Sequence, residues 1–442
     1  MPLPADGGRL HILTLVSDDI IGCRVEPGAG GLGKDAVADA LTRGLQRLPL
    51  EGARVLVLIP DGTRTFPAAQ MFRQLTELLR PRVRRVDFMV ALGTHPPLSP
   101  DRLLALVGLD AAEKAARYAD VGLFNHAWND PAALTTLGTI SADEIGALSG
   151  GRLRLDVAVR LNRAILDYDH LIVCGPVFPH EVVGFSGGNK YFFPGIAGRD
   201  IIDFTHWLGA LVTSYATIGT KDTAVRRVID RATNLIPRPR HAICSVVTHH
   251  GLVGLFVGPV EAAWSAAADL SARHHMIWTD RTYDQVLSVL PPMYDELWVG
   301  GKGMYKTEPA VADGGEVILY APHLREVSVV HGRLIRQIGY HVRDYFTAQW
   351  DRFRALPWGV VAHSTHVKGN GTYEGGVERP RINVTLATGI PADECRSLNL
   401  GYRDPATVDP AAFAGRESEG VLLVPKAGEY LYRPKNSTAP RA

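Results

Sequence analysis

Three turns in the first half of the chain combine glycine or proline with side chains that can bind anions or transfer protons. The first turn contains Asp61 and Arg64, the second contains His95, and the third contains His180. Each follows a short apolar run typical of a buried strand, and ligands of open α/β sheets bind at the carboxyl ends of strands. One such turn is compatible with ordinary capping, but three in succession predict a shared pocket.

The densest polar segment runs from His180 to His206. The glycine-rich run inside it comprises Ser186, Gly187, Gly188 and Lys190. Its glycines allow a ligand to approach the backbone, and successive N–H groups ahead of a helix suit a phosphate. The lysine would then lie beside an anion, and a histidine can carry a proton or bind a metal near neutral pH. From these residues alone, a ligand site and a structural hydrogen-bond network are both open.

The elements that must position these residues follow a strand, helix, strand order. Apolar runs at 55–59 and 86–92 flank a stretch at 68–79 whose apolar positions have helical spacing. This order predicts parallel pairing with helices covering the sheet. Further strands are predicted at 171–173, 243–247, 252–257, 285–290, 296–299 and 317–320, and further helices at 196–212 and 262–275.

These elements predict an α/β fold made of two α/β domains with mostly parallel sheets and an active site in the cleft between them. A chain of 442 residues is long enough, since domains typically take about 100 to 200 residues each. We place an N-terminal domain carrying the motifs at 1–270 and a C-terminal domain closing over the substrate at 271–442. The glycine- and charge-rich segment 369–381 predicts a long ordered loop.

The composition argues against several classes of partner. The 47 basic and 46 acidic residues nearly cancel, and no basic run is present, so we expect no nucleic acid partner. The apolar runs are far shorter than the roughly 20 residues that span a bilayer, so we expect no membrane segment. The first 25 residues carry three aspartates and a broken apolar run, which predicts no signal peptide and a cytoplasmic location. The four cysteines show neither zinc-site nor disulfide spacing.

Taken together, these motifs resemble the nickel-dependent lactate racemase family of 2-hydroxyacid racemases and epimerases. The resemblance is strong over most of residues 50–260 and weaker downstream, where Lys302 lies twelve residues before Gly314. The matching motifs, in order along the chain, are Asp61-x-Thr63-Arg64, Gly93-Thr94-His95-Pro96, Pro179-His180, Gly184-x-Ser186-Gly187-Gly188-x-Lys190, Pro194-Gly195 and His206.

The resemblance implies a nickel-pincer nucleotide, a cofactor whose pyridinium ring carries nickel through one carbon and two sulfur atoms. It implies a thioamide link to Lys190 and a nickel ligand at His206, and sulfur and imidazole donors suit Ni(II). It also implies cofactor-biosynthesis proteins as partners. The implied cofactor-binding residues are Lys190, Asp61, Thr63, Ser186, Gly187 and Gly188.

The resemblance further implies an isomerase that racemises or epimerises a 2-hydroxy acid by proton-coupled hydride transfer. His95 and His180 match the two bases that such a reaction needs, one for each enantiomer. Arg64 and Lys302 match the groups that hold the substrate carboxylate. The residues before Lys302 differ from the family pattern and the stretch 363–381 is polar, so we expect a substrate larger or more polar than lactate.

Two other functions are compatible with parts of the pattern. Ser186-x-x-x-Lys190 resembles the Schiff-base lysine motif of pyridoxal phosphate enzymes, where a phosphate and an aldehyde meet near a lysine. That reading leaves the three histidines of the motifs without a role. A non-catalytic nucleotide-binding protein is the other alternative, but a carrier has no need of acid–base groups on two faces of its ligand.

Overall fold

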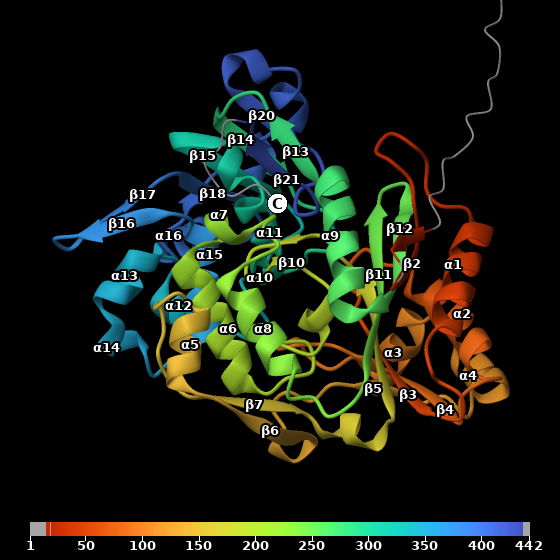
Figure 1. Cartoon of the computed structure of the whole chain (residues 1–442). Coiled ribbons are helices and arrows are strands. Elements are labelled where there is room, and N and C mark those ends of the chain that lie inside the picture. The colour runs from red at the N-terminus through yellow and green to blue at the C-terminus, as the bar shows by residue number, and fades with distance from the viewer. Residues whose placement is uncertain (1–14, 18, 436–442) are drawn as a thin grey trace, which may run out of the picture.

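The computed structural model describes residues 15–17 and 19–435. Two larger sheets with helices around them make up most of this part of the chain (Figure 1). The predicted α/β class with mostly parallel sheets is confirmed. The prediction of no signal peptide rests mainly on residues 1–14, which lie outside the described residues.

The first sheet carries the motif-bearing strands at its centre. Its five strands from β11 to β5 pair in parallel, and β12, β2 and β1 extend it with antiparallel pairing. The strand order is β1 (Leu15–Ser17), β2 (Ile20–Arg24), β12 (Gly251–Pro259), β11 (Arg240–Thr248), β8 (His170–Pro176), β3 (Arg54–Ile59), β4 (Arg85–Val90) and β5 (Leu123–Asn125).

Strand β3 is apolar on both faces because helices cover both sides of this sheet. Val55 and Val57 pack into a core with α1 (Lys34–Gln46) and α2 (Ala68–Leu79), whereas Leu56 packs into a second core on the opposite face. That second core includes α6 (Arg199–Val212), α8 (Ala224–Thr233) and α9 (Val260–His275). The helix predicted at 68–79 is confirmed, and the one predicted at 196–212 begins at Arg199 instead.

The second sheet contains five strands, all paired in parallel. Its order is β19 (Gly401–Tyr402), β18 (Asn383–Thr388), β15 (Val311–Ala321), β14 (Tyr283–Val289) and β20 (Val421–Val424). The chain then returns to the first half, because β21 (Leu431–Pro434) pairs with β13 (Met276–Thr279), which directly follows α9. The division into domains at residue 270 stays a prediction.

Shorter elements surround the two sheets (Figure 1). In the first half they are α3 (Pro100–Leu106), α4 (Ala111–Arg117), β6 (Leu134–Ile140), α5 (Ala142–Leu148), β7 (Val157–Asn162), β9 (Pro179–His180), β10 (Gly184–Phe185) and α7 (Ser214–Thr217). In the second half they are α10 (Leu297–Gly300), α11 (Lys302–Tyr305), α12 (Gly332–Ile338), α13 (Arg343–Ala348), α14 (Trp350–Phe353), α15 (Trp358–Lys368), β16 (Gly371–Glu374), β17 (Val377–Pro380) and α16 (Ala392–Ser397).

Two predictions for the second half are wrong. The strand predicted at 296–299 is the short helix α10, because a brief apolar run does not distinguish a buried strand from a buried helical turn. The segment 369–381 is a hairpin of β16 and β17 rather than a loop. Gly375 and Gly376 both take positive φ, as a tight hairpin turn requires.

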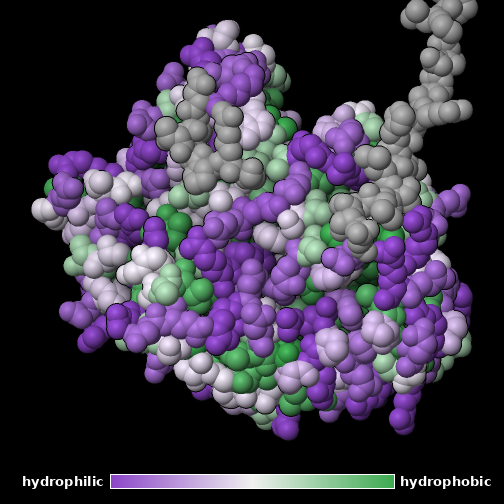
Figure 2. Space-filling view, in the orientation of Figure 1, coloured by the Kyte–Doolittle hydropathy of each residue, from purple (hydrophilic) through white to green (hydrophobic). Residues whose placement is uncertain are grey.

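The surface is mixed in polarity, and its apolar segments are short. No helix within residues 15–17 and 19–435 is long and apolar enough to cross a membrane. On the face drawn in Figure 2, hydrophobic residues form separate patches among hydrophilic ones. All four cysteines are buried and free, and Cys174 lies in the core.

Candidate active site

The three polar turns meet because β8, β3 and β4 are neighbours in the first sheet. Their carboxyl ends form one wall of a pocket, and the glycine-rich run together with α6, α10, α11 and α15 adds further lining. The predicted site residues that line it are Asp61, Arg64, His95, His180, Ser186, Gly187, Lys190, His206 and Lys302. Thr63 and Gly188 lie just outside this lining.

Asp61 orients His95 through a hydrogen bond between its Oδ2 atom and the ring Nδ1. Burial alone would raise the pKa of Asp61, but His95, Arg64 and the Thr63 hydroxyl hold that pKa well below its ordinary value. The carboxylate is therefore ionised and accepts the Nδ1 proton, which leaves the lone pair of Nε2 free. Thr63 donates to Asp61 Oδ1 at 2.6 Å and accepts from Arg64 at 2.6 Å, so one chain of contacts links all four side chains.

His180 has the opposite ring tautomer. Its Nδ1 accepts the backbone N–H of Val182 at 3.2 Å, so the proton of the neutral ring lies on Nε2. Burial, followed by the charges of Lys190 and Arg64, lowers the pKa of His180 well below its ordinary value. A carboxylate oxygen of Glu181 lies 3.3 Å from the same Nδ1 and can stabilise the ring when it gains a proton.

Lys190 lies on a 3₁₀ turn, Gly188–Tyr191, at the C-terminal end of the glycine-rich run. Burial and the nearby Arg64 guanidinium lower the pKa of Lys190 to about 8. A lysine with this pKa has a substantial fraction of neutral, nucleophilic amine near neutral pH. Its environment therefore suits covalent attachment of a ligand better than that of an exposed lysine.

His206 is held in the tautomer that a metal ligand needs. Its Nδ1 donates a hydrogen bond to the carbonyl of Ile202 one helical turn earlier, at 2.7 Å. In the neutral ring this leaves the lone pair of Nε2 available to bind a metal. Burial lowers the pKa of the ring, which keeps it neutral. Among the described residues, no group of three or more His, Cys, Asp or Glu side chains is placed to hold a metal ion.

Three basic side chains, Arg64, Lys302 and Lys306, lie together near the rings of Phe178 and Tyr294; we call them the cation cluster. The Arg64 guanidinium lies 5.9 Å from the centre of the Phe178 ring, and Lys306 Nζ lies 4.9 Å from it. Lys302 Nζ lies 4.9 Å from the centre of the Tyr294 ring. Burial, together with the neighbouring cations, lowers the pKa of Lys302 well below its usual value, so this cluster favours an anionic ligand.

The glycine-rich run is held by contacts from distant helices. The buried Arg226 donates to the carbonyl of Phe185, and its guanidinium lies 4.1 Å from the centre of the Trp264 ring. The Trp264 indole N–H donates to the Ser186 carbonyl at 2.9 Å. The Ser186 hydroxyl bonds to the backbone of Pro176 and Phe178. Ser186 therefore shapes the loop, and its role toward a phosphate stays a prediction.

Comparison with known proteins bears on the same residues. A family model described as the lactate racemase N-terminal domain matches residues 34–219, which include every predicted site residue of the first half. Two lactate racemases, from Thermoanaerobacterium thermosaccharolyticum and Lactiplantibacillus plantarum, are each 24% identical to this chain. Each match covers 63% of this chain and 62% of the relative.

Residues 34–219 thus form a lactate racemase N-terminal domain. Among solved structures, a Thermotoga maritima protein is 30% identical with a TM-score of 0.83, covering 93% of this chain and all of that one. The lactate racemase apoprotein of Thermoanaerobacterium thermosaccharolyticum is 18% identical with a TM-score of 0.68, covering 91% of this chain and 94% of that one. This second likeness shows a shared fold over both halves.

Several residues that line the pocket are not among the predicted site residues. Their signals were weak because most belong to short helices of the second half. Glu181 was adjacent to a predicted base. His363 and His366 belong to the stretch 363–381, whose polarity was noted, but no pattern predicted that they lie on the buried helix α15. The additional pocket residues with polar or aromatic chemistry are Glu181, Trp298, Tyr305, His363 and His366.

Replacing Gly188 with alanine should destabilise this protein more than the same change at Gly375. Both glycines have nearly the same backbone, with φ of +57° and +59°. A Cβ at Gly188 would lie 2.8 Å from the Trp264 ring, whereas a Cβ at Gly375 would meet nothing within 4 Å. The left-handed backbone costs an alanine roughly 1–2 kcal/mol at either site, and overpacking adds about 1–3 kcal/mol at Gly188 alone.

Urea denaturation of both variants measures this difference. Equal losses in the free energy of unfolding would show that the Trp264 contact does not constrain the glycine-rich run.

Proposed function

We propose that this protein is an isomerase that racemises or epimerises a 2-hydroxy acid larger or more polar than lactate, with a nickel-pincer nucleotide attached to Lys190. The observation that carries the proposal is the pair of pocket histidines with complementary tautomers. In the neutral rings, the contact with Asp61 leaves Nε2 of His95 unprotonated, whereas the contact with the Val182 N–H places the proton of His180 on Nε2. Inverting carbon 2 needs two acid–base groups, because one must remove the proton of the substrate hydroxyl and the other must return a proton to that oxygen on the opposite side.

The cation cluster supports a carboxylic acid as the substrate. Arg64 can grip a carboxylate with two parallel hydrogen bonds, and Lys302 adds a second positive charge at the same pocket. Although burial lowers the pKa of Lys302, an arriving carboxylate favours its protonated form. Both residues thus bind the acid group and orient the carbon next to it.

The proton steps follow from the two tautomers. His95 takes the proton of the substrate hydroxyl, and the ionised Asp61 stabilises the positive ring that results. His180, when protonated with Glu181 beside its ring, returns a proton to that oxygen, and the two rings exchange these roles for the opposite enantiomer. When bound, the nickel-pincer nucleotide supplies a reversible acceptor for the hydride of carbon 2.

The residues present fit this cofactor. The lowered pKa of Lys190 makes its amine available for a covalent link, and His206 offers a free Nε2 to nickel. The Asp61 and Thr63 pair braces the same wall of the pocket. We assign Ser186, Gly187 and Gly188 to the loop that would receive the cofactor phosphate, and we expect cofactor-biosynthesis proteins to load the chain.

The decisive experiment combines intact-mass spectrometry and metal analysis of protein made together with the cofactor-making enzymes. We expect a covalent adduct on Lys190 and about one nickel per chain, with interconversion of the enantiomers of a 2-hydroxy acid. The His206→Ala variant should keep the adduct and lose most of its nickel. Full activity without adduct or nickel would overturn the proposal, and a reversible aldimine absorbance would favour pyridoxal phosphate instead.

A further inference from the structure

Helix α15 brings two histidines to the pocket that the proton steps above do not use. The helix packs against α6, and the Gly359 N–H donates to Asp203 at 2.9 Å across that contact. His363 and His366 both line the pocket, with only 8% and 4% of their surface exposed. Within the described residues, the Nε2 atom of neither ring has a hydrogen-bond partner.

Unpaired nitrogens in such a place indicate a ligand, because leaving a buried polar atom without a hydrogen-bond partner is energetically unfavourable. Aromatic neighbours pack against both rings but give their Nε2 atoms no hydrogen bond. His363 stacks on Trp298 with ring centres 4.0 Å apart, and His366 meets the edge of Tyr305 at 6.4 Å. The last torsion of a histidine is broad, so a small ring rotation can direct Nε2 to a ligand in the pocket.

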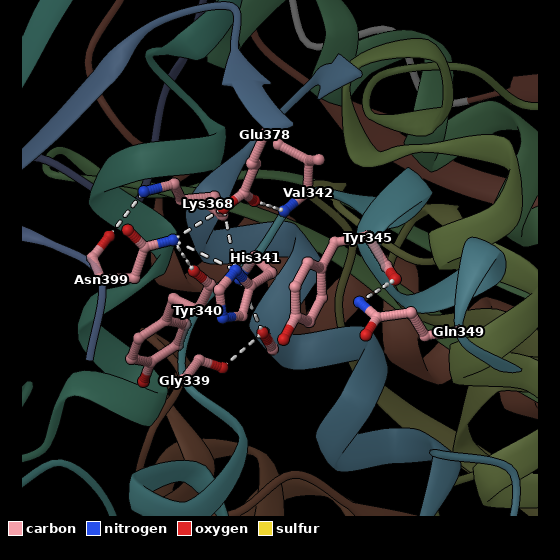
Figure 3. Close-up of polar contacts among 10 residues, drawn as sticks. Gly339, Tyr340, His341, Val342, Tyr345, Gln349, Lys368, Glu378 and Asn399 are labelled. Atoms are coloured by element: carbon pink, nitrogen blue, oxygen red, sulfur yellow. Dashed lines mark hydrogen bonds and ion pairs between the residues drawn. The ribbon is translucent and has the colours of Figure 1, made fainter. Parts of the chain in front are cut away.

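The helix that carries these histidines is fixed in place. Ser364, between them in the sequence, accepts the His341 N–H and donates to the Gly339 carbonyl. Figure 3 shows the network around this contact, in which Glu378 and Asn399 both bond to His341. Preorganisation on a rigid helix is what a specificity site requires.

The charge state of His363 and His366 indicates which chemical groups they can bind at the end of the substrate beyond carbon 2. Burial lowers the pKa of His366 to about 4 and that of His363 well below its ordinary value, so both rings are neutral. A neutral imidazole offers one donor and one acceptor, which matches a hydroxyl group. The titratable groups that face His366 and His363 from neighbouring elements are Glu181, His206 and His331. Burial lowers the pKa of His206 and of His331, so these rings are neutral, and the Glu181 carboxylate would repel a second carboxylate.

We propose that His363 and His366 are specificity-determining residues that hydrogen-bond hydroxyl groups of the substrate beyond carbon 2. The preferred substrates are then polyhydroxy acids, rather than 2-hydroxy acids with an apolar tail or a second carboxylate. This inference rests on the proposed function, since it concerns the far end of the same substrate. Arg64 and Lys302 hold the near end.

The test compares kcat/KM for three 2-hydroxy acids in the loaded enzyme: a six-carbon aldonate, 2-hydroxybutyrate and malate. His363→Phe keeps the stack on Trp298, and His366→Leu keeps apolar volume, while each removes the ring nitrogens. Each variant should lose roughly ten- to hundredfold on the aldonate and little on 2-hydroxybutyrate. His331→Phe is the matched control, because the His331 ring also contacts Trp298, in a tilted arrangement, but does not line the pocket. This variant should leave the ratio unchanged.

Binding of the aldonate to the unloaded chain, followed by calorimetry, gives a readout that does not depend on turnover. Both variants should weaken it, and His331→Phe should not. A wild type that prefers malate or 2-hydroxybutyrate, or variants that leave the substrate ratio unchanged, would overturn this inference while the proposed function stands. Failure of every 2-hydroxy acid to react would instead overturn the proposed function.

Discussion

Replacing His95 with alanine should lower kcat/KM for racemisation by a factor of roughly 10² to 10⁴, the usual contribution of a general base. The loss follows because, among the residues that line the pocket, His95 is the imidazole that Asp61 orients through Nδ1, and no other lining group can replace it. Nickel content and the mass of the Lys190 adduct should be unchanged, since we assign His95 to proton transfer and to neither nickel binding nor cofactor attachment. Rates in both directions, measured with each pure enantiomer, test this result.

Asp61→Asn is the companion variant for this prediction. Asparagine cannot accept the Nδ1 proton through an ionised oxygen, so the ring loses both its preferred tautomer and its stabilising charge. Because both residues act through one ring, the double variant should be scarcely slower than His95→Ala alone. Independent, multiplying losses would show that Asp61 acts elsewhere, and near-normal turnover by His95→Ala would remove the two-base assignment.

Replacing Lys190 with methionine should abolish cofactor attachment and with it all measurable turnover. Methionine keeps the length of the side chain but has no nucleophilic amine. Lys190→Arg is the matched control for charge, because it retains a cation at the same place and should be equally inactive. Intact-mass spectrometry after loading measures the outcome, and an adduct of full mass on either variant would show that the cofactor is attached elsewhere.

The unloaded protein allows a test of the same lysine without the cofactor. Since burial lowers the pKa of Lys190 to about 8, its neutral amine is present above that pH and is lost as the pH falls below it. Its acylation by a small reagent should therefore rise through a midpoint near pH 8, whereas ordinary lysines titrate near about 10.4. Peptide mapping with the exposed Lys34 as internal reference measures this. A midpoint near 10 would contradict the buried environment.

Much of the first half could be predicted because its signals are local. The run 55–59 is apolar on both faces, the stretch 68–79 has helical spacing, and the next run repeats the strand pattern, which together indicate parallel pairing. Parallel strands end at one sheet edge, so the turns carrying Asp61, His95 and His180 had to lie close together if their strands were neighbours. The strand order β8, β3, β4 satisfies that condition.

The sequence by itself thus determined the α/β class, the motif residues and their family resemblance, because residue type and short spacing carry that information. Tertiary structure alone decided the ring tautomers, since these depend on which groups His95, His180 and His206 meet. It also decided that 363–368 is a buried helical wall, because that helix has little amphipathic pattern and is covered on all sides. Burial and partners are set by contacts between distant segments, and no local pattern encodes them.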